Sequence, residues 1–270
     1  MWLACVLAWA GAFSQEPPAI EPETQSAGGK VERVTMERGE KAVPLFMELY
    51  AASSDPATPM LVLFHQARSS KGEYRPIAPR LRALGYNCLA VDLSCGWTFR
   101  EVKNLTAKIA KDAGRNPTYL DGLVDMRDAL RWARENRAHG KIVAWGISYS
   151  AALSLVVAAE RPDLVDGVMA FSPGEYFTAV GKSATWVAES VREVACPVFV
   201  TSARNEEVDW KPILAAVGSK AKHSFLPTGA GTHGSSALWP ESAESAQYWE
   251  AVEGFLKRYF SPAAEPAKEK

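Results

Sequence analysis

Residues 141–152 read KIVAWGISYSAA, an apolar run followed by Gly-x-Ser-x-Ser and then by small apolar residues. This pattern predicts a short buried strand, a sharp turn at Ser148 and a helix. A turn of this kind, the nucleophile elbow, strains the serine backbone and needs small residues two positions before and after it. Gly146 and Ser150 hold those positions, Ser150 in place of the usual glycine. The alternative is an ordinary turn in which the Ser148 side chain caps the helix.

The rest of the chain alternates between strand-like and helix-like patterns. Strands are expected at residues 31–36, 43–51, 60–64, 87–92, 142–145, 167–171, 198–201 and 222–226. Helices are expected at residues 74–84, 120–137, 151–159, 210–217 and 247–259. Continuous apolar strands that alternate with helices are typical of a parallel sheet covered on both faces. The first two strands, joined by Arg38-Gly39-Glu40-Lys41, predict an antiparallel hairpin at one edge.

Composition excludes several classes of protein. The 270-residue chain is 47% hydrophobic and carries 30 basic and 31 acidic residues. We find no basic cluster with interleaved aromatic residues, so nucleic acid is not an expected partner. No apolar run is long enough for a stable membrane span. There is no cysteine or histidine spacing typical of zinc and no glycine-rich phosphate loop, so neither a metal nor an organic cofactor is predicted.

The two ends of the chain differ from its middle. Residues 1–14 are apolar and end in small residues, which favours a signal peptide and export to the periplasm or beyond. The alternative, a buried helix or a wrongly chosen start, would leave the protein in the cytoplasm. Residues 15–30 read as a flexible linker, 31–260 as the folded domain and 261–270 as a disordered tail.

Four cysteines occur, at positions 5, 88, 95 and 196. Removal of the leader would leave three, so one disulfide at most could form, and Cys88 with Cys95 is the nearest pair. The simpler interpretation makes Cys88 and Cys196 buried thiols beside strands. Asn104-Leu105-Thr106 also matches a glycosylation triplet.

Functional side chains are sought just after strands, because ligands of open α/β sheets bind outside the carboxyl ends of the strands. Ser148 is one such residue, but a serine hydroxyl needs a base to become a nucleophile. His233 lies in a glycine-rich loop after the last strand and is the favoured base. The alternatives are His65, His139 and His223.

A carboxylate that orients the imidazole is expected after the strand at 198–201. Glu206 is best placed, and Glu207, Asp209 and Glu175 remain as alternatives.

An oxyanion hole needs two backbone N–H groups. Tyr149, directly after the serine, and Gln66, after the strand at 60–64, are the candidates.

Aromatic residues could line a hydrophobic acyl pocket near this site. They are Trp97, Tyr149, Tyr176, Phe177 and Trp186, the last three in an insertion at 172–194 that could act as a small lid. The alternative is that most of these rings pack in the core or within the lid.

The order of these segments resembles the α/β-hydrolase superfamily, and within it the dienelactone hydrolase-like and small serine esterase groups. The resemblance covers about residues 40–260 and rests on LVLFHQ at 61–66, GYNCLAVD at 85–92, GISYS at 146–150, PVFV at 197–200 and THG at 232–234. It implies a mostly parallel sheet and a chain order of serine, acid and histidine, which favours His233 over His65. Dienelactone hydrolases have a cysteine at the elbow where this chain has Ser148, so dienelactone is not implied as the substrate.

The resemblance implies a serine hydrolase that cleaves a small-molecule carboxylic ester through an acyl-enzyme. Ser148 would be the nucleophile, His233 the base and Glu206 the orienting acid. A peptidase for short peptides and a non-catalytic protein that has kept the fold are the alternatives. The sequence does not indicate an oligomeric state.

Overall fold

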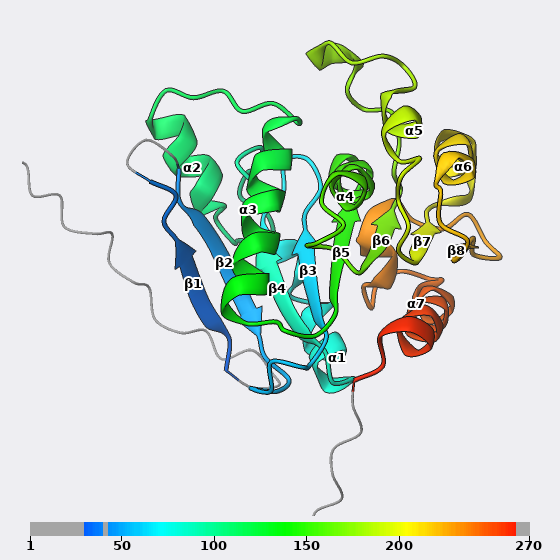
Figure 1. Cartoon of the computed structure of the whole chain (residues 1–270), viewed down its shortest axis with the longest axis horizontal. Coiled ribbons are helices and arrows are strands. Elements are labelled where there is room, and N and C mark those ends of the chain that lie inside the picture. The colour runs from blue at the N-terminus through cyan, green and yellow to red at the C-terminus, as the bar shows by residue number, and fades with distance from the viewer. Residues whose placement is uncertain (1–29, 40–42, 263–270) are drawn as a thin grey trace, which may run out of the picture.

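A single sheet of eight strands forms the centre of the computed structural model, which describes residues 30–39 and 43–262 (Figure 1). The strands are β1 (Glu32–Met36), β2 (Leu45–Tyr50), β3 (Met60–Phe64), β4 (Asn87–Val91), β5 (Ile142–Ile147), β6 (Gly167–Phe171), β7 (Val198–Thr201) and β8 (Lys222–Phe225). Their order is β1-β2-β4-β3-β5-β6-β7-β8. Only the β1–β2 and β2–β4 pairs are antiparallel. The predicted parallel sheet with an antiparallel pair at one edge is confirmed.

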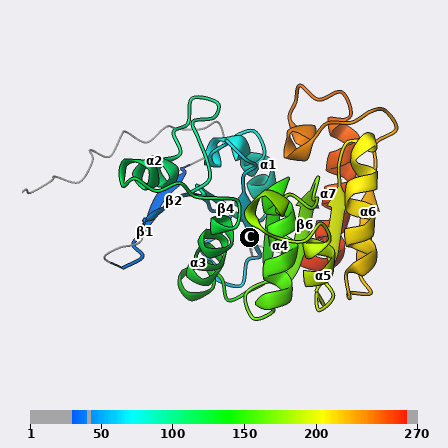
Figure 2. The same ribbon diagram turned by 90° about the horizontal axis from the view of Figure 1, so that it is seen from above.

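Helices lie on both faces of the sheet. They are α1 (Ala78–Ala83), α2 (Leu105–Asp112), α3 (Asp121–Asn136), α4 (Tyr149–Glu160), α5 (Trp186–Ser190), α6 (Glu207–Ala216) and α7 (Ser245–Phe260). Short 3₁₀ helices add η1 (Lys71–Tyr74), η2 (Thr178–Val180), η3 (Arg204–Glu206) and η4 (Gly234–Leu238). Figure 2 shows α3, α4 and α5 on one side of the sheet and α1 and α7 on the other.

Each central strand contributes to two hydrophobic cores, because successive side chains point to opposite faces. In β3, Met60, Val62 and Phe64 pack into the core beneath α3 and α4, whereas Leu61 and Leu63 pack into the core beneath α1 and α7. Every residue of β3 is therefore buried. This explains why the central strands read as unbroken apolar runs.

The boundaries differ from the expected ones at the elbow. Strand β5 extends to Ile147 and α4 begins at Tyr149, so Ser148 is the only residue between strand and helix. The expected helix at 74–84 is shorter in the structure, because α1 covers only Ala78–Ala83 and Tyr74 belongs to the preceding η1. Pro79 lies within the first two positions of α1, where its missing N–H costs nothing.

Helix α2 was not expected from the sequence. Asn104 precedes it and accepts a hydrogen bond from the Ala107 N–H at 2.8 Å, as an N-cap residue does. The Asn104 side chain is only 3% exposed, and its amide nitrogen donates to Ser69 O and Leu93 O. The match to a glycosylation triplet is therefore misleading, because this side chain faces the interior.

Cys88, Cys95 and Cys196 are free thiols, so the disulfide between Cys88 and Cys95 is not formed. Cys88 is buried as expected, whereas Cys196 is only half-buried. Cys5, the leader at 1–14, nearly all of the linker at 15–30, the Glu40-Lys41 part of the hairpin turn and most of the tail at 261–270 lie outside the described residues. Over residues 30–39 and 43–262, no helix has the length and apolar character of a membrane span.

Candidate active site

The Ser148 backbone has the strained conformation of a nucleophile elbow. Its φ is 57° and its ψ is −123°, a region that residues with a side chain rarely adopt. A Cβ at Gly146 would lie 2.2 Å from the Ser150 carbonyl oxygen, so only glycine fits there. The Ser148 side chain makes no capping hydrogen bond to α4. The interpretation of Ser148 as a helix-capping serine is therefore wrong.

Ser150 replaces the second glycine of the elbow without disturbing the turn. Its Oγ accepts the Ile147 N–H at 2.9 Å. The same hydroxyl lies 2.9 Å from both Phe64 O and Ile147 O, to either of which it can donate. The substitution thus ties the end of β5 to the end of β3.

His233 and Glu206 form a direct contact, with 2.6 Å between His233 Nδ1 and Glu206 Oε1. Glu206 ends η3 after β7, and His233 follows β8. The hydrogen bond that His233 donates to Glu206, against the effect of burial, raises the pKa of His233. Burial raises the pKa of Glu206, but its hydrogen bonds with His233 and Ser172 outweigh burial, so the net direction is downward. An ionised carboxylate beside an imidazole stabilises the imidazolium that forms when the ring accepts a proton.

Ser172 connects the acid to the histidine loop. Its Oγ donates to Glu206 Oε2 at 2.6 Å and accepts the Gly234 N–H at 2.9 Å. Ser172 has a φ of 55°, which aims its side chain from the end of β6 in an uncommon direction. Sequence analysis missed this residue, although it obeys the same rule as the others, since it is polar and directly follows a buried strand.

The Ser148 hydroxyl is linked to these groups through Tyr176, whose hydroxyl donates to Ser172 O at 2.8 Å. Within the described residues, no hydrogen bond joins it to His233. It interacts instead with the hydroxyl of Tyr176, whose pKa burial raises to about 12 while Ser148 acts to lower it. A Cβ at Gly234, next to the histidine, would lie 2.4 Å from the Ile147 side chain, next to the serine. Catalytic hydrogen bonds are often long or misaligned in the free enzyme.

The rival carboxylates make other contacts. Glu175 accepts the N–H groups of Val187 and Ala188 at the start of α5. Glu207 pairs with Lys211, one turn along α6, and Asp209 is exposed. Of the four acids considered, Glu206 is the one that contacts His233.

The side chains of the rival histidines His223 and His65 make structural contacts, whereas His139 is held through its backbone N–H. His223 Nε2 lies 2.7 Å from the Tyr259 hydroxyl. The backbone N–H of His139 donates to Pro56 O. His65 is buried; its Nε2 accepts the Leu93 N–H at 2.9 Å, so its Nδ1 carries the proton and donates to Gln66 O at 2.7 Å. Burial lowers the pKa of His65, which keeps the ring neutral.

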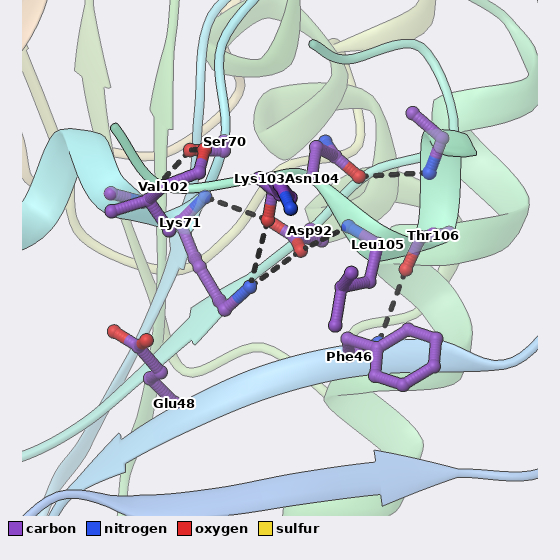
Figure 3. Close-up of polar contacts among 12 residues, drawn as sticks. Phe46, Glu48, Ser70, Lys71, Asp92, Val102, Lys103, Asn104, Leu105 and Thr106 are labelled. Atoms are coloured by element: carbon purple, nitrogen blue, oxygen red, sulfur yellow. Dashed lines mark hydrogen bonds and ion pairs between the residues drawn. The ribbon is translucent and has the colours of Figure 1, made fainter. Parts of the chain in front are cut away.

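A buried polar network holds the loop that follows β3 (Figure 3). Asp92, at the end of β4, accepts from the backbone N–H of Lys71 at 2.8 Å and from its ammonium at 2.7 Å. The Leu105 N–H donates to the same carboxylate at 2.9 Å. This loop is therefore held by a buried ion pair, in which the side chain of Lys71 is 8% exposed and that of Asp92 is 0% exposed.

The two predicted oxyanion donors differ in their surroundings. Tyr149 is the first residue of α4, where N–H groups have no partner within the helix. The Gln66 N–H donates to Glu73 Oε2 at 3.1 Å. Glu73 is a fully buried acid of η1 that sequence analysis did not single out.

The predicted pocket aromatics occupy different environments. Tyr176 is half-buried and lies beside Ser148, whereas Trp97 is 59% exposed and lies beneath the Lys111 ammonium. Phe177 is fully buried and meets the half-buried Trp186 edge to face, so Phe177 does not line an open surface. The insertion at 172–194 contains η2 and α5, and α5 packs against α4 and α6.

No group of three or more metal-binding side chains is found over residues 30–39 and 43–262. The site described here consists of a hydroxyl, an imidazole, carboxylates and backbone N–H groups.

Solved structures with a similar fold include several hydrolases. A dienelactone hydrolase from Anabaena variabilis is 18% identical, with a TM-score of 0.62 over 85% of this chain and 98% of its own. An esterase from Pyrococcus furiosus is 16% identical, with a TM-score of 0.65 over 85% and 93%. An acylaminoacyl peptidase from Pyrococcus horikoshii is 12% identical, with a TM-score of 0.62 over 88% of this chain but 42% of its own.

Sequence comparison adds nothing to this likeness, because no protein-family model and no curated protein matches the chain. At such low identities the similarity establishes the fold alone. The mostly parallel eight-stranded sheet with its antiparallel N-terminal pair and surrounding helices matches the fold of these neighbours. The chain therefore has the α/β-hydrolase fold, in the form seen in dienelactone hydrolases and small esterases.

Proposed function

We propose that this protein is a serine hydrolase that cleaves small carboxylic esters through an acyl-enzyme. The Ser148 oxygen attacks the ester carbonyl while its proton passes to His233 Nε2. The C–O bond to the alcohol then breaks and the alcohol leaves with that proton. Water, deprotonated by the same ring, attacks the acyl-enzyme and restores the serine.

The observation that carries this proposal is the 2.6 Å contact between His233 and Glu206, beside a serine with a φ of 57°. The contact fixes the ring so that Nδ1 bears a proton and Nε2 is free to accept one. For the reaction the Ser148 hydroxyl must leave Tyr176 and donate to His233 Nε2. The N–H groups of Tyr149 and Gln66 are proposed to bind the oxyanion, and loss of one such donor typically costs about 3–4 kcal/mol.

The first test is covalent labelling of the intact protein with a fluorophosphonate. Labelling is expected in the wild type and is expected to disappear in Ser148→Ala. Ser154→Ala is a matched control, because Ser154 is a buried serine of the same helix that donates only to Ser150 O. An unlabelled wild type, or labelling that survives in Ser148→Ala, would reject the nucleophile.

The substrate class needs a second measurement. The acylaminoacyl peptidase among the structural neighbours makes short acylated peptides the second candidate. A series of p-nitrophenyl esters graded by acyl length, run beside N-acyl amino acid amides, separates the two classes. A protein that is neither labelled nor active on either class would favour the non-catalytic alternative.

Export is proposed on the apolar character of residues 1–14 alone. N-terminal sequencing of protein produced in the native host tests it. A mature chain that begins near residue 15 would agree with export, and one that begins at Met1 would contradict it.

A further inference from the structure

Glu73 is a buried acid at the meeting point of the catalytic loops. It is 0% exposed, and its Oε2 accepts the Gln66 N–H at 3.1 Å. Its other oxygen, Oε1, is buried without a hydrogen bond of normal geometry among the described residues, and the Ser69 hydroxyl, which is also buried and unpaired, is the side chain that acts on this carboxyl. An ionised carboxylate can accept about four hydrogen bonds, and burial without them is costly. The arrangement therefore favours a protonated carboxyl with an unused donor.

Charged and titratable groups near Glu73 come from each neighbouring element. His233 approaches from the loop after β8 and interacts electrostatically with the carboxylate. The Glu73 charge also acts on Tyr149 of α4 and on Tyr74, the residue that follows Glu73 in η1. Lys71 is neutralised by Asp92 at 2.7 Å, and His65 is neutral. Of these groups, only His233 has a charge that changes during the proposed reaction.

We propose that Glu73 is a further catalytic residue, which must be protonated for turnover and then donates its O–H to the oxyanion. This inference rests on the proposed serine hydrolase function and on Gln66 as an oxyanion donor. In the resting structure Glu73 occupies the N–H that the oxyanion needs. Two acceptors of one N–H lie roughly 3–5 Å apart, so an ionised Glu73 would repel the negative charge that develops on the substrate.

Protonation of the carboxyl removes this repulsion, and the Gln66 N–H is then shared between Glu73 Oε2 and the oxyanion. Its hydroxyl supplies a third donor to the oxyanion, beside the N–H groups of Tyr149 and Gln66. No bond to Glu73 forms or breaks in the reaction, and its proton stays on the carboxyl through the cycle. The protein environment supports this state, because burial raises the pKa of Glu73 to about 7 against the opposing effects of Gln66, Ser69 and His233.

The proposal predicts the shape of the pH–rate profile. Activity should fall at low pH, where His233 is protonated, and also at high pH, where Glu73 ionises. In Glu73→Gln, an amide of the same size keeps an acceptor for Gln66 and a donor for the oxyanion. The alkaline fall should disappear. The acidic fall should remain, because the hydrogen bond with Glu206 is the main cause of the raised pKa of His233.

The experiment measures the second-order rate of fluorophosphonate labelling from pH 5 to 9. This readout needs no knowledge of the natural substrate. Above a midpoint near 7, the wild-type rate should fall about tenfold for each pH unit, so Glu73→Gln should be about 100-fold faster at pH 9. Glu48→Gln is the matched control, since Glu48 is a buried acid of β2 paired with Tyr50 and Arg75. Its profile should match the wild type.

A wild-type rate that stays level from pH 7 to 9, or a Glu73→Gln profile with the wild-type shape, overturns the proposal. Thermal unfolding establishes that each variant is folded. Should Glu73→Gln not fold, the infrared band of the protonated carboxyl in the wild type must titrate with the alkaline midpoint. Survival of labelling in Ser148→Ala would instead overturn the serine hydrolase function, which keeps the two failures distinct.

Discussion

Replacement of Glu73 by glutamine should stabilise the protein by an amount that grows with pH. Burial raises the pKa of this acid from its ordinary value of 4.5 to about 7. The folded state therefore binds the proton more tightly than the unfolded state does. The sign follows directly: folding stability falls as pH rises from about 4.5 to 7 and then stays level.

The magnitude follows from the size of the shift. A pKa difference of one unit corresponds to about 1.4 kcal/mol, so the shift gives a cost of up to about 3 kcal/mol above pH 7. Glu73→Gln removes this cost. At pH 5 the wild-type side chain is already a neutral carboxyl, and the substitution should change the free energy of unfolding little. At pH 8 the variant should be more stable than the wild type by up to about 3 kcal/mol.

Urea denaturation of both proteins at pH 5 and pH 8 measures this effect. The quantity of interest is the change in the variant-minus-wild-type difference between the two pH values, because all other titrating groups cancel in it. Glu48→Gln, run in parallel, should show no such growth, since the Glu48 carboxylate is already paired with Arg75 and Tyr50. An equal difference at pH 5 and pH 8 would refute the reasoning that Glu73 titrates inside the folded protein.

The remaining predictions concern the elbow, the acid and the loop that follows β3. Gly146→Ala should cost about 1–3 kcal/mol in urea denaturation and abolish labelling, because the added Cβ would lie 2.2 Å from a backbone oxygen; retention of full labelling would contradict the strained elbow. Ser172→Ala removes a 2.6 Å donor to Glu206 and should lower kcat/KM roughly tenfold without loss of fold, whereas an unchanged rate would show that the acid needs no such support. Asp92→Asn leaves the Lys71 ammonium buried without its partner and should destabilise the protein by about 3–5 kcal/mol; a change below 1 kcal/mol in the same denaturation assay would show that the ion pair does not hold the loop.

The sheet could be predicted because most of its strands are covered on both faces. All residues of β3, β4, β5 and β6 are buried. Such strands leave unbroken apolar runs in the sequence, and the alternating helices then specify parallel connections. The strand order could not be predicted, because it depends on how the connecting helices pack against the two faces of the sheet.

Helix α2 shows where periodicity fails. Only Thr106 and Ala110 of its eight residues are buried, so it has almost no apolar stripe to detect. The sequence feature that marks the start of this helix is the capping residue Asn104, which also fits a glycosylation triplet. A capping side chain is a local hydrogen bond, and the same Asn-x-Thr letters fit both interpretations.

Some residues of the candidate site could likewise be predicted from the sequence, and others could not. Ser148, Glu206 and His233 each follow a strand, so a rule based on strand ends brings them into consideration. The sequence could not choose between Glu206 and its neighbours, because that choice depends on which loop reaches His233. Glu73 escaped notice because an acid in a short helix is ordinarily exposed. Its burial arises from tertiary packing, as η1 folds back onto the loop that carries Gln66.

Two independent properties of the protein should report the same proton on Glu73. The stability difference between wild type and Glu73→Gln is a property of the resting fold, whereas the alkaline fall in labelling rate is a property of the reaction. If one carboxyl governs both, the stability difference should level off at the pH where the labelling rate begins to fall, near pH 7, apart from the influence of His233, which is coupled to it. A stability difference that levels off near pH 7 without an alkaline fall in rate would mean that the acid is merely buried. Agreement of the two would mean that the charge which is costly to the fold is also the one that blocks the oxyanion site.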